Sequence, residues 1–186
     1  TSGLEPGFDQ LIQFAAIRTD LELNELERHE ITARLSVDVV PAPAAVLTHQ
    51  IDPSSFDQGQ PEYEAVAEIH RILNTPGTLS GGYNTLGFDD EFLRFSFHRN
   101  LLPPYTHQYA NGCGRFDLYP LAILYYLYAP EVCQWPEVEG RPSLKLEGLS
   151  MANQLAEGPA HQAIVDVEAT VALARLFKRN ATIWDF

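Results

Sequence analysis

The order of hydrophobic and polar residues along the chain predicts three β-strands. The apolar run Gln13–Thr19 and the alternating stretch Glu27–Leu35 are typical of strands, and the polar segment Asp20–Glu25 predicts the turn between them. Leu79–Tyr83 is a short apolar run that predicts a third, buried strand, which leads into a loop at Asn84–Gly87.

Apolar residues at helical spacing predict helices between and after these strands. Pro61 suits the first turn of a helix, where its missing N–H has no hydrogen bond to make. The run Leu118–Leu127 is apolar nearly all round, so we expect its helix to be buried. Strands that alternate with helices indicate an α/β layer architecture. The predicted helices are a short one through Leu47, one that runs from Pro61 to Pro76-Gly77, Asp89–Arg99, Leu118–Leu127, Leu144–Asn153 and Gln162–Arg179, with a long loop at Glu131–Ser143.

Composition narrows the class of protein. The chain has 186 residues, 45% of them hydrophobic, which suits one domain with a real core. Twelve Lys and Arg against 25 Asp and Glu give a net charge of −13, which argues against a general polyanion binder unless metal ions or a local Arg cluster reverse the sign in one cleft. No apolar run is long enough to span a membrane. Cys113 and Cys133 form no disulfide or zinc pattern, so we expect free thiols and a cytoplasmic protein.

Asp89 is the first candidate for chemistry. It lies in Asn84-x3-Phe88-Asp89-Asp90, directly after a predicted strand and at the start of a predicted helix. One interpretation is an acid that caps the helix and complements its dipole. The other is a metal ligand at the carboxyl end of a strand, where α/β sheets place their sites.

His161 and Asp166 form the second candidate, a His-x4-Asp pair. Within one helix the two side chains would lie about 140° apart around the axis and could not share a face. They can act together only if His161 stands in the loop after Gly158-Pro159 and Asp166 lies in the first turns of the helix. The alternative is a surface histidine beside a solvated acid.

Further stretches match one enzyme family in the family's own order. Together with Asp89, His161 and Asp166 they resemble the DEDD 3′–5′ exonucleases, in the subclass with a catalytic histidine, and more closely the exodeoxyribonuclease I family of bacterial single-strand DNA exonucleases. The resemblance implies a ribonuclease H-like fold, in which helices flank a mixed sheet, with residues 1–186 as a single exonuclease domain. The matching stretches are 1–6, 13–20, 43–48, 82–91, 115–118, 142–147 and 160–170.

The resemblance also implies roles for individual residues. Asp89 and Asp166 take the roles of metal ligands, and His161 takes the role of the general base. Substrate binding falls to four residues: Thr1 contacts the terminal 3′ hydroxyl, Leu4 packs against the last bases, Phe88 packs beneath the site, and Asn84 belongs to the motif that carries Asp89. A buried core position predicts the same packing for Phe88.

The implied reaction is the release of 5′-mononucleotides from the 3′ end of single-stranded DNA, in DNA repair and recombination. Two Mg²⁺ ions, or Mn²⁺, activate the water and stabilise the leaving 3′ oxygen, while His161 removes a proton from the water. The implied partners are single-stranded DNA and the single-strand DNA-binding protein of a bacterium.

Two carboxylates of the family pattern are not among these residues. The family's Asp-x-Glu lies on its first, central strand, and Thr1 would directly follow that Glu. We therefore expect an N-terminally truncated domain, inactive or impaired in this form, because a lost central strand leaves unpaired backbone groups. The family also has C-terminal SH3-like and helical domains, and we expect these to be absent from this chain. Two alternatives stay open: a nuclease-like binding module that no longer cuts, and an RNA-directed exonuclease of the same superfamily.

Other charged and aromatic residues have two interpretations each. Arg115 and Asp117 are a structural pair or a substrate contact. Tyr105, Tyr109 and Phe97 could stack on unpaired bases, but aromatic residues at helical spacing more often belong to a core, so none of them is assigned to a site.

Overall fold

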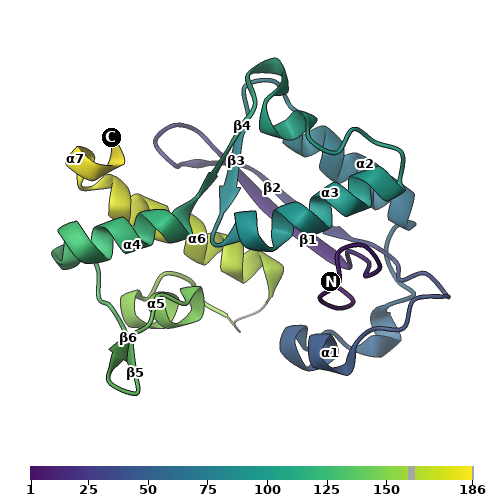
Figure 1. Cartoon of the computed structure of the whole chain (residues 1–186), viewed down its shortest axis with the longest axis horizontal. Helices are drawn as coiled ribbons and strands as arrows, with labels where there is room; N and C mark the ends of the chain where they lie inside the picture. The colour runs from purple at the N-terminus through teal and green to yellow at the C-terminus, as the bar shows by residue number, and fades with distance from the viewer. Residues whose placement is uncertain (159–161, 186) are drawn as a thin grey trace. The chain divides into compact units, whose positions relative to one another are not determined.

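The computed structural model describes residues 1–158 and 162–185, and its first two strands follow the predicted pattern (Figure 1). Strand β1 spans Gln13–Thr19, as predicted, and pairs with strand β2 at Glu25–Thr32. The second strand therefore begins two residues earlier and ends three residues earlier than the alternation of Glu27–Leu35 indicates. After β2, the chain continues to an isolated bridge between Ala33 and Gln60.

Two more strand pairs complete the sheet structure of the described residues. Strand β3 (Leu79–Gly82) pairs with β4 (Gly114–Asp117), and β5 (Glu137–Val138) pairs antiparallel with β6 (Arg141–Pro142). The sequence pattern predicted β3 but not β4, and the predicted loop Glu131–Ser143 holds the small β5–β6 hairpin. The α/β class is confirmed, with its strands in pairs.

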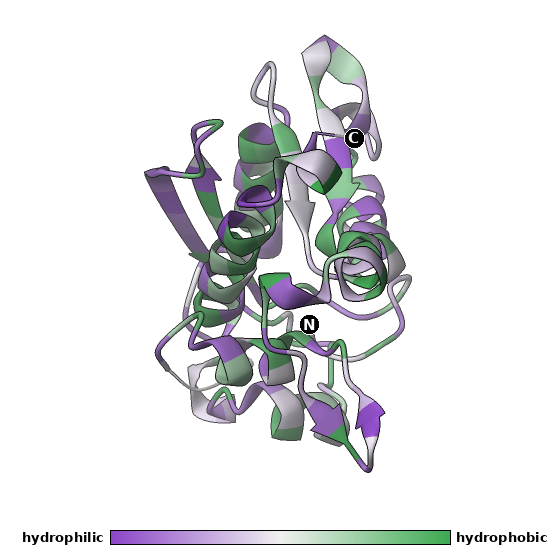
Figure 2. Cartoon of the chain, turned by 90° about the vertical axis from the view of Figure 1, so that its left-hand side faces the viewer, coloured by the Kyte–Doolittle hydropathy of each residue, from purple (hydrophilic) through white to green (hydrophobic). Residues whose placement is uncertain are grey.

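The predicted helices are present, most of them with ends shifted by a residue or two. In Figure 2 hydrophilic and hydrophobic residues recur along the helices, as the periodicity requires. Short 3₁₀ turns connect several of the longer elements. The α-helices are α1 (Pro43–His49), α2 (Glu62–Leu73), α3 (Asp89–Arg99), α4 (Leu118–Tyr128), α5 (Leu146–Asn153), α6 (Ala163–Lys178) and α7 (Ala181–Trp184).

The chain divides into two compact units, each with its own hydrophobic core. Unit 1 contains Thr1–Ala15, His29–Gly81 and Thr85–Phe116, and unit 2 contains Ala16–Arg28, Gly82–Asn84 and the chain from Asp117 onward. Helices α1, α2 and α3 belong to unit 1, and α4, α5, α6 and α7 belong to unit 2.

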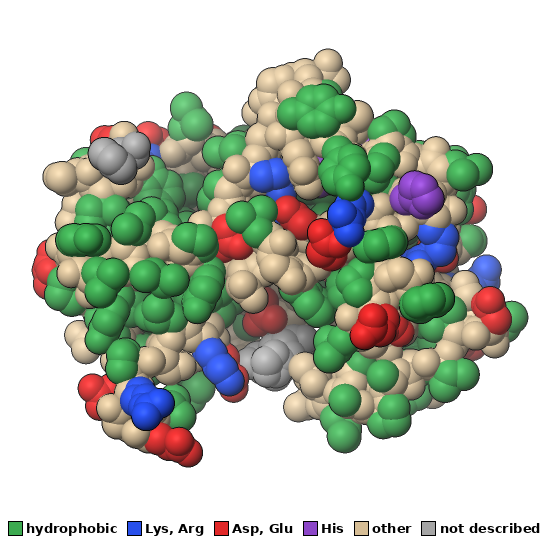
Figure 3. Space-filling model, in the orientation of Figure 1, with side chains coloured by type: hydrophobic (Ala, Val, Ile, Leu, Met, Phe, Trp, Pro, Cys, Tyr) green, Lys and Arg blue, Asp and Glu red, His purple; other side chains and the backbone are tan. Residues whose placement is uncertain are grey.

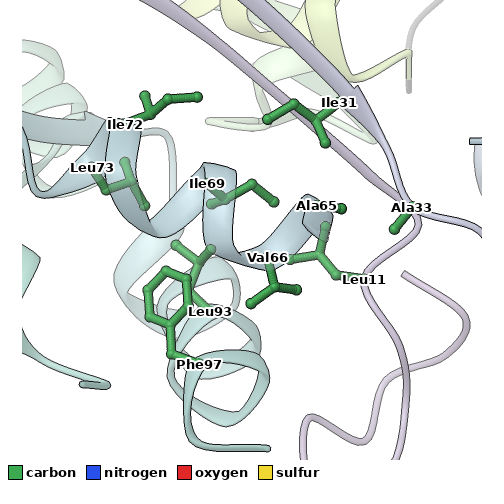
Figure 4. Close-up of a cluster of buried hydrophobic side chains, with 10 residues drawn as sticks. All are labelled: Leu11, Ile31, Ala33, Ala65, Val66, Ile69, Ile72, Leu73, Leu93 and Phe97. Carbon is green, nitrogen blue, oxygen red and sulfur yellow. The ribbon is translucent and has the colours of Figure 1, made fainter. Parts of the chain in front are cut away.

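The core of unit 1 forms around helix α2. Ala65, Val66 and Ile69 are almost completely buried on this helix, and side chains from α3 and from the residues around β2 enclose them (Figure 4). Removal of this apolar surface from water holds α3 against α2 through the buried side chains of Leu93 and Phe97. The buried members of the cluster are Leu11, Ile31, Ala33, Ala65, Val66, Ile69, Ile72, Leu73, Leu93 and Phe97.

The core of unit 2 is built on a pair of stacked rings. The rings of Tyr125 on α4 and Phe177 on α6 lie 4.2 Å apart between centroids and only 9° from parallel. The Tyr125 hydroxyl donates to the carbonyl oxygen of Phe177 at 2.6 Å, so its polar end is satisfied although the residue is fully buried. This contact fixes α4 against α6.

Helix α4 is not buried all round, and the prediction that it is buried was wrong. Only Leu118, Ala122 and Tyr125 are buried, whereas Leu127 is 60% exposed and Tyr128 is 75% exposed. In Figure 3 hydrophobic side chains gather over α4. Uniform apolar composition removed the polar face that would have marked the solvent side, so periodicity could not distinguish the two faces.

His107 is a buried titratable group in unit 1. Its side chain is fully buried, and within the described part of the chain neither ring nitrogen has a hydrogen-bond partner. The ring meets Phe97 edge-on at 5.5 Å between centroids. Burial lowers the pKa of His107 from 6.5 to about 4, and the nearby Arg115 and His70 add to the effect.

We predict that His107 makes the protein less stable as the pH falls from about 6.5 to about 4. In this window the unfolded chain takes up a proton that the folded chain does not, so protonation favours unfolding, at a cost of about 3 kcal/mol once the pH is below both pKa values. Above pH 6.5 the group is neutral in both states and has no effect. Denaturant unfolding between pH 7.5 and pH 4 should show a smaller loss of stability in His107→Leu than in the wild type, and equal losses would contradict the prediction.

Candidate functional site

The loop at the N-terminus of unit 1 is closed by its own side chains. The Asp9 carboxylate accepts hydrogen bonds from the Ser2 hydroxyl at 2.9 Å and from the Glu5 N–H at 2.8 Å. Ser2 also donates its N–H to the carbonyl oxygen of Gln10, and its hydroxyl accepts from the Gln10 N–H, both at 2.8 Å. Ser2 and Gln10 are buried, so these bonds hold the loop in one conformation.

Glycine at position 3 is required by this closure. A Cβ atom at Gly3 would lie 2.3 Å from Oδ2 of Asp9, which is far inside a normal contact. Next to it, the Leu4 side chain is 72% exposed. Thr1 is half-buried, and its hydroxyl donates to the Gly3 carbonyl oxygen at 2.7 Å. Of the residues predicted to bind substrate, Leu4 is therefore available to a ligand, and Thr1 has a hydroxyl that is already engaged within the loop.

Asp89 is the first residue of helix α3, as predicted. Asp90 and Glu91 follow it, so the first turn carries three carboxylates at the positive end of the helix dipole. Asp89 keeps an accessible surface, yet protein atoms surround its carboxyl, and this burial raises its pKa to about 6. The neighbouring Asp90 raises the pKa further, whereas the Arg115 guanidinium opposes the shift.

Asp90 has a different environment from Asp89. Its carboxylate accepts hydrogen bonds from both Nε and Nη2 of Arg115, the former at 3.2 Å. The two side chains are only 9% and 10% exposed. Arg115 on β4 therefore forms a buried ion pair with Asp90 through two hydrogen bonds. Arg115 thus has a structural role, but its partner is Asp90 and not Asp117.

Phe88 precedes α3 and packs against the helix itself. Its ring lies 4.9 Å from the ring of Phe92 at 46°, while about a third of its surface, 36%, stays exposed. The Phe88 carbonyl oxygen accepts a hydrogen bond from the Phe92 N–H at 3.3 Å, which is the first bond of the helix. Phe88 thus supports the start of α3 and keeps a partly accessible ring beside Asp89.

Asn84 and Asp117 belong to unit 2 and contact each other. Asn84 adopts a left-handed backbone, with φ of 60°, and donates its N–H to Oδ1 of Asp117 at 2.8 Å. The same oxygen accepts from the Tyr119 N–H at 2.8 Å and caps helix α4. Asp117 therefore has a structural role, and it fixes the loop that carries Asn84.

Asp166 lies in the first turn of α6 and is half-buried, as the predicted helix required. Its carbonyl oxygen accepts a hydrogen bond from the Thr170 hydroxyl at 2.7 Å, and its N–H donates to Gln162 at 3.1 Å. His161, the predicted general base, lies outside the described residues. Asp89 belongs to unit 1 and Asp166 to unit 2, so each half of the candidate site is described within its own unit.

The donor chemistry of Asp89 and Asp166 fits a divalent metal ion. Carboxylate oxygens are the ligands that Mg²⁺ and Mn²⁺ prefer, and a carboxyl whose ionised form is disfavoured by burial gains from a nearby cation. In the parts of the chain that the structure describes, no three His, Cys, Asp or Glu side chains gather into a ready-made metal cluster.

Comparisons with known proteins agree with the fold. The chain matches the family model Exonuclease (RNase T) over residues 1–174. It is 38% identical over 190 residues to exodeoxyribonuclease I of Escherichia coli (strain K12), covering 100% of this chain and 40% of that protein. Within residues 1–158 and 162–185, no helix is long and apolar enough to cross a membrane.

Two solved structures are similar over the whole chain. Exonuclease I from Methylocaldum szegediense superposes with a TM-score of 0.94 at 40% identity, covering 100% of this chain and 40% of that one. The zinc-bound form of the E. coli ExoI–ssDNA complex superposes with a TM-score of 0.94 at 38% identity, covering 100% and 40%. The predicted α/β fold of the ribonuclease H-like exonucleases is confirmed. The chain spans about two fifths, or 40%, of the length of these relatives.

We predict that Asp90→Asn destabilises the protein more than most single substitutions. It leaves the Arg115 guanidinium buried without its counter-charge, and breaking a buried ion pair from one side costs about 3–5 kcal/mol. The measurement is denaturant unfolding, with Asp57→Asn on an exposed turn as the matched control. A loss in Asp90→Asn no larger than in the control would show that the pair has no such role.

Proposed function

We propose that this chain, which belongs to the exonuclease (RNase T) family, is the nuclease domain of an enzyme that degrades single-stranded DNA from its 3′ end. The observation that carries the proposal is the position of Asp89, an accessible carboxylate surrounded by protein atoms at the start of α3 directly after β3 and its loop. The relatives named above are exodeoxyribonucleases, which favours DNA over RNA as the substrate.

Asp89 and Asp166 would hold the divalent metal ions, Mg²⁺ or Mn²⁺, in this proposal. When bound, such ions supply positive charge at the scissile phosphate and lower the pKa of bound water. The zinc-bound relative is consistent with a divalent cation, and the oxygen ligands favour Mg²⁺ for this chain. Without cations the Asp89 carboxylate would repel the phosphates, whereas the charges of Asp90 and Glu91 are paired with Arg115 and Arg94.

The chain's own side chains would perform the remaining steps. His161 accepts a proton from the attacking water, a role that suits a neutral imidazole near pH 7. Leu4 packs against the terminal bases, Thr1 contacts the terminal 3′ hydroxyl, and Phe88 supports Asp89 from below. Asn84 presents its side chain from a loop that Asp117 fixes.

The proposal extends to the full-length protein. By analogy with the relatives, of which the chain spans 40%, we propose C-terminal domains, a role in DNA repair and contact with single-strand DNA-binding protein. The buried free thiols Cys113 and Cys133 agree with the cytoplasmic location that we predict. The comparisons do not support the expectation that this form is inactive. The experiments below distinguish a nuclease from a binding module that no longer cuts.

We predict that Asp89→Asn in the full-length protein lowers the rate of nucleotide release from single-stranded DNA more than about 100-fold, since loss of even an outer-shell partner of a metal ligand costs about 10–100-fold. The substitution keeps the shape and removes the charge that holds the cation. The measurement is mononucleotide release at a series of Mg²⁺ concentrations, with Asp57→Asn as the control. Normal release by Asp89→Asn would refute the assignment, and wild-type binding that ignores Mg²⁺ and is never followed by cleavage would favour the binding module.

We predict a different signature for His161→Asn. Loss of a general base lowers kcat about 10²–10⁴-fold while the substrate still binds. Binding of a fluorescent oligonucleotide should therefore be nearly unchanged while turnover falls.

DNA and RNA oligomers of one sequence, compared in the wild type, test the substrate. Faster nucleotide release from RNA would assign the chain to the RNA-directed exonucleases.

A further inference from the structure

The first turn of helix α6, which carries Asp166, has few contacts of its own to hold it. The N–H groups that open a helix have no partner within the helix. In the described part of the chain no side-chain hydrogen bond caps this end, where Gln162 occupies the cap position. Within Ala163–Lys178, all of which is described, the first buried residue is Ala169. Asp166 therefore precedes the apolar anchor of its helix.

An ion pair within unit 2 ties this end of α6 to strand β2. Nη1 of Arg28 donates to Oε1 of Glu168 at 2.5 Å, and Glu168 lies two positions after Asp166. Nε and Nη2 of Arg28 donate to the two carboxylate oxygens of Glu25, each at 2.9 Å. Because Glu25 fixes the plane of the guanidinium from two sides, the third nitrogen is oriented toward Glu168.

The ion pair borders a hollow rather than a closely packed interface. A cavity of about 230 Å³ lies between the β1–β2 hairpin and α6. Ile17 and Arg28 line it from the hairpin, and Glu168, Ala172 and Arg175 line it from the helix. Atoms that face a hollow lack partners for dispersion contacts. Side-chain hydrogen bonds therefore carry much of the connection between the hairpin and this part of α6.

The far end of α6 is tied to the same hairpin by other residues. Nζ of Lys178 forms an ion pair with Glu22 at 2.8 Å. Arg175 donates from Nε and Nη2 to the carbonyl oxygen of Leu23, at 3.1 and 2.6 Å. Lys178 follows Asp166 by about 18 Å along the helix axis, so its contacts fix the last turn of α6 and not the first.

From these contacts we infer that Arg28 is a positioning residue for Asp166, because through Glu168 it fixes the first turns of α6 against β2. Two positions correspond to about 3 Å along the helix axis, so the backbones of Asp166 and Glu168 move together. The inference rests on the proposed function, in which the Asp166 carboxylate holds a metal ion. A displacement of about 1 Å is enough to weaken a site that depends on geometry.

The Mg²⁺ dependence of nucleotide release by the full-length protein tests the inference. The side chains of Arg28 and Glu168 are 37% and 34% exposed, and a pair of this exposure changes an equilibrium by up to about fivefold. Arg28→Gln should therefore raise the Mg²⁺ concentration for half-maximal release about threefold to fivefold, and the rate should recover at saturating Mg²⁺. Lys178→Gln, which removes an ion pair from the other end of the same helix, is the matched control and should leave the Mg²⁺ requirement unchanged.

Exchange of the two charges separates the ion pair from the effect of either residue alone. Arg28→Glu places a third carboxylate beside Glu25 and Glu168, so it should raise the Mg²⁺ requirement more than Arg28→Gln does. The double substitution Arg28→Glu, Glu168→Arg restores opposite charges and should return the requirement toward that of the wild type. A double variant as impaired as Arg28→Glu would overturn the inference.

Hydrogen exchange tests the tie without metal or substrate. The Asp166 N–H donates to the Gln162 carbonyl oxygen at 3.1 Å, and peptides that contain it should exchange faster in Arg28→Gln than in the wild type or Lys178→Gln. Unchanged exchange, or an unchanged Mg²⁺ requirement in Arg28→Gln, would overturn the inference, while Mg²⁺-dependent release by the wild type leaves the proposed function intact. A full-length wild type that releases no nucleotides at any Mg²⁺ concentration would overturn the proposed function and, with it, the role of Arg28.

Discussion

The buried ion pair between Asp90 and Arg115 is the constraint on which the candidate chemistry of unit 1 depends. Three adjacent carboxylates at the start of α3 repel one another, and the helix dipole offsets that repulsion only in part. Arg115, held on β4, neutralises the middle one and ties the first turn of α3 to a strand. Asp89 next to it keeps an accessible surface, and burial of its carboxyl among protein atoms raises its pKa to about 6. A metal ion beside Asp89 would act in the same direction as Arg115 and favour the ionised carboxylate.

The N-terminal loop shows how a local constraint can leave apolar side chains on the surface. Asp9 takes the space that a side chain at position 3 would need, and its carboxylate closes the loop onto Ser2 and Glu5. Hydrogen bonds within the loop and to Ala42 fix its backbone, and two of its apolar side chains stay on the surface. Leu4 and Phe8 are the result, at 72% and 86% exposure. An order that is complete before a ligand arrives lowers the entropy lost on binding.

The periodicity of apolar residues predicted the positions of the helices well. It did not predict strand β4, the exposed side of α4 or the Asp90–Arg115 ion pair. The ends of α3 agree because acids open the helix and a basic residue closes it, which are signals carried by neighbouring residues. Strand β4 was missed because four residues give no alternation, and α4 was misplaced because no polar face marks its solvent side. Asp89 and Asp166 could be proposed from their places at element starts. The partner of Arg115 could not, since Asp90 lies 25 positions away and only the fold brings the two together.

In a basic protein, arginine side chains can both orient neighbouring groups and attract phosphate. An acidic chain that binds a polyanion needs another source for the attraction. In unit 1, Arg94, Arg99 and Arg115 each have a carboxylate partner, in Glu91, Glu62 and Asp90. Paired guanidinium groups still orient rings and helices but give little net attraction for phosphate. In the proposed function, cations held by Asp89 and Asp166 would supply the attraction instead. In the same proposal such cations act only where the end of the strand reaches the carboxylates that hold them. A net charge of −13 would then favour correct placement of the 3′ end over indiscriminate adhesion to DNA.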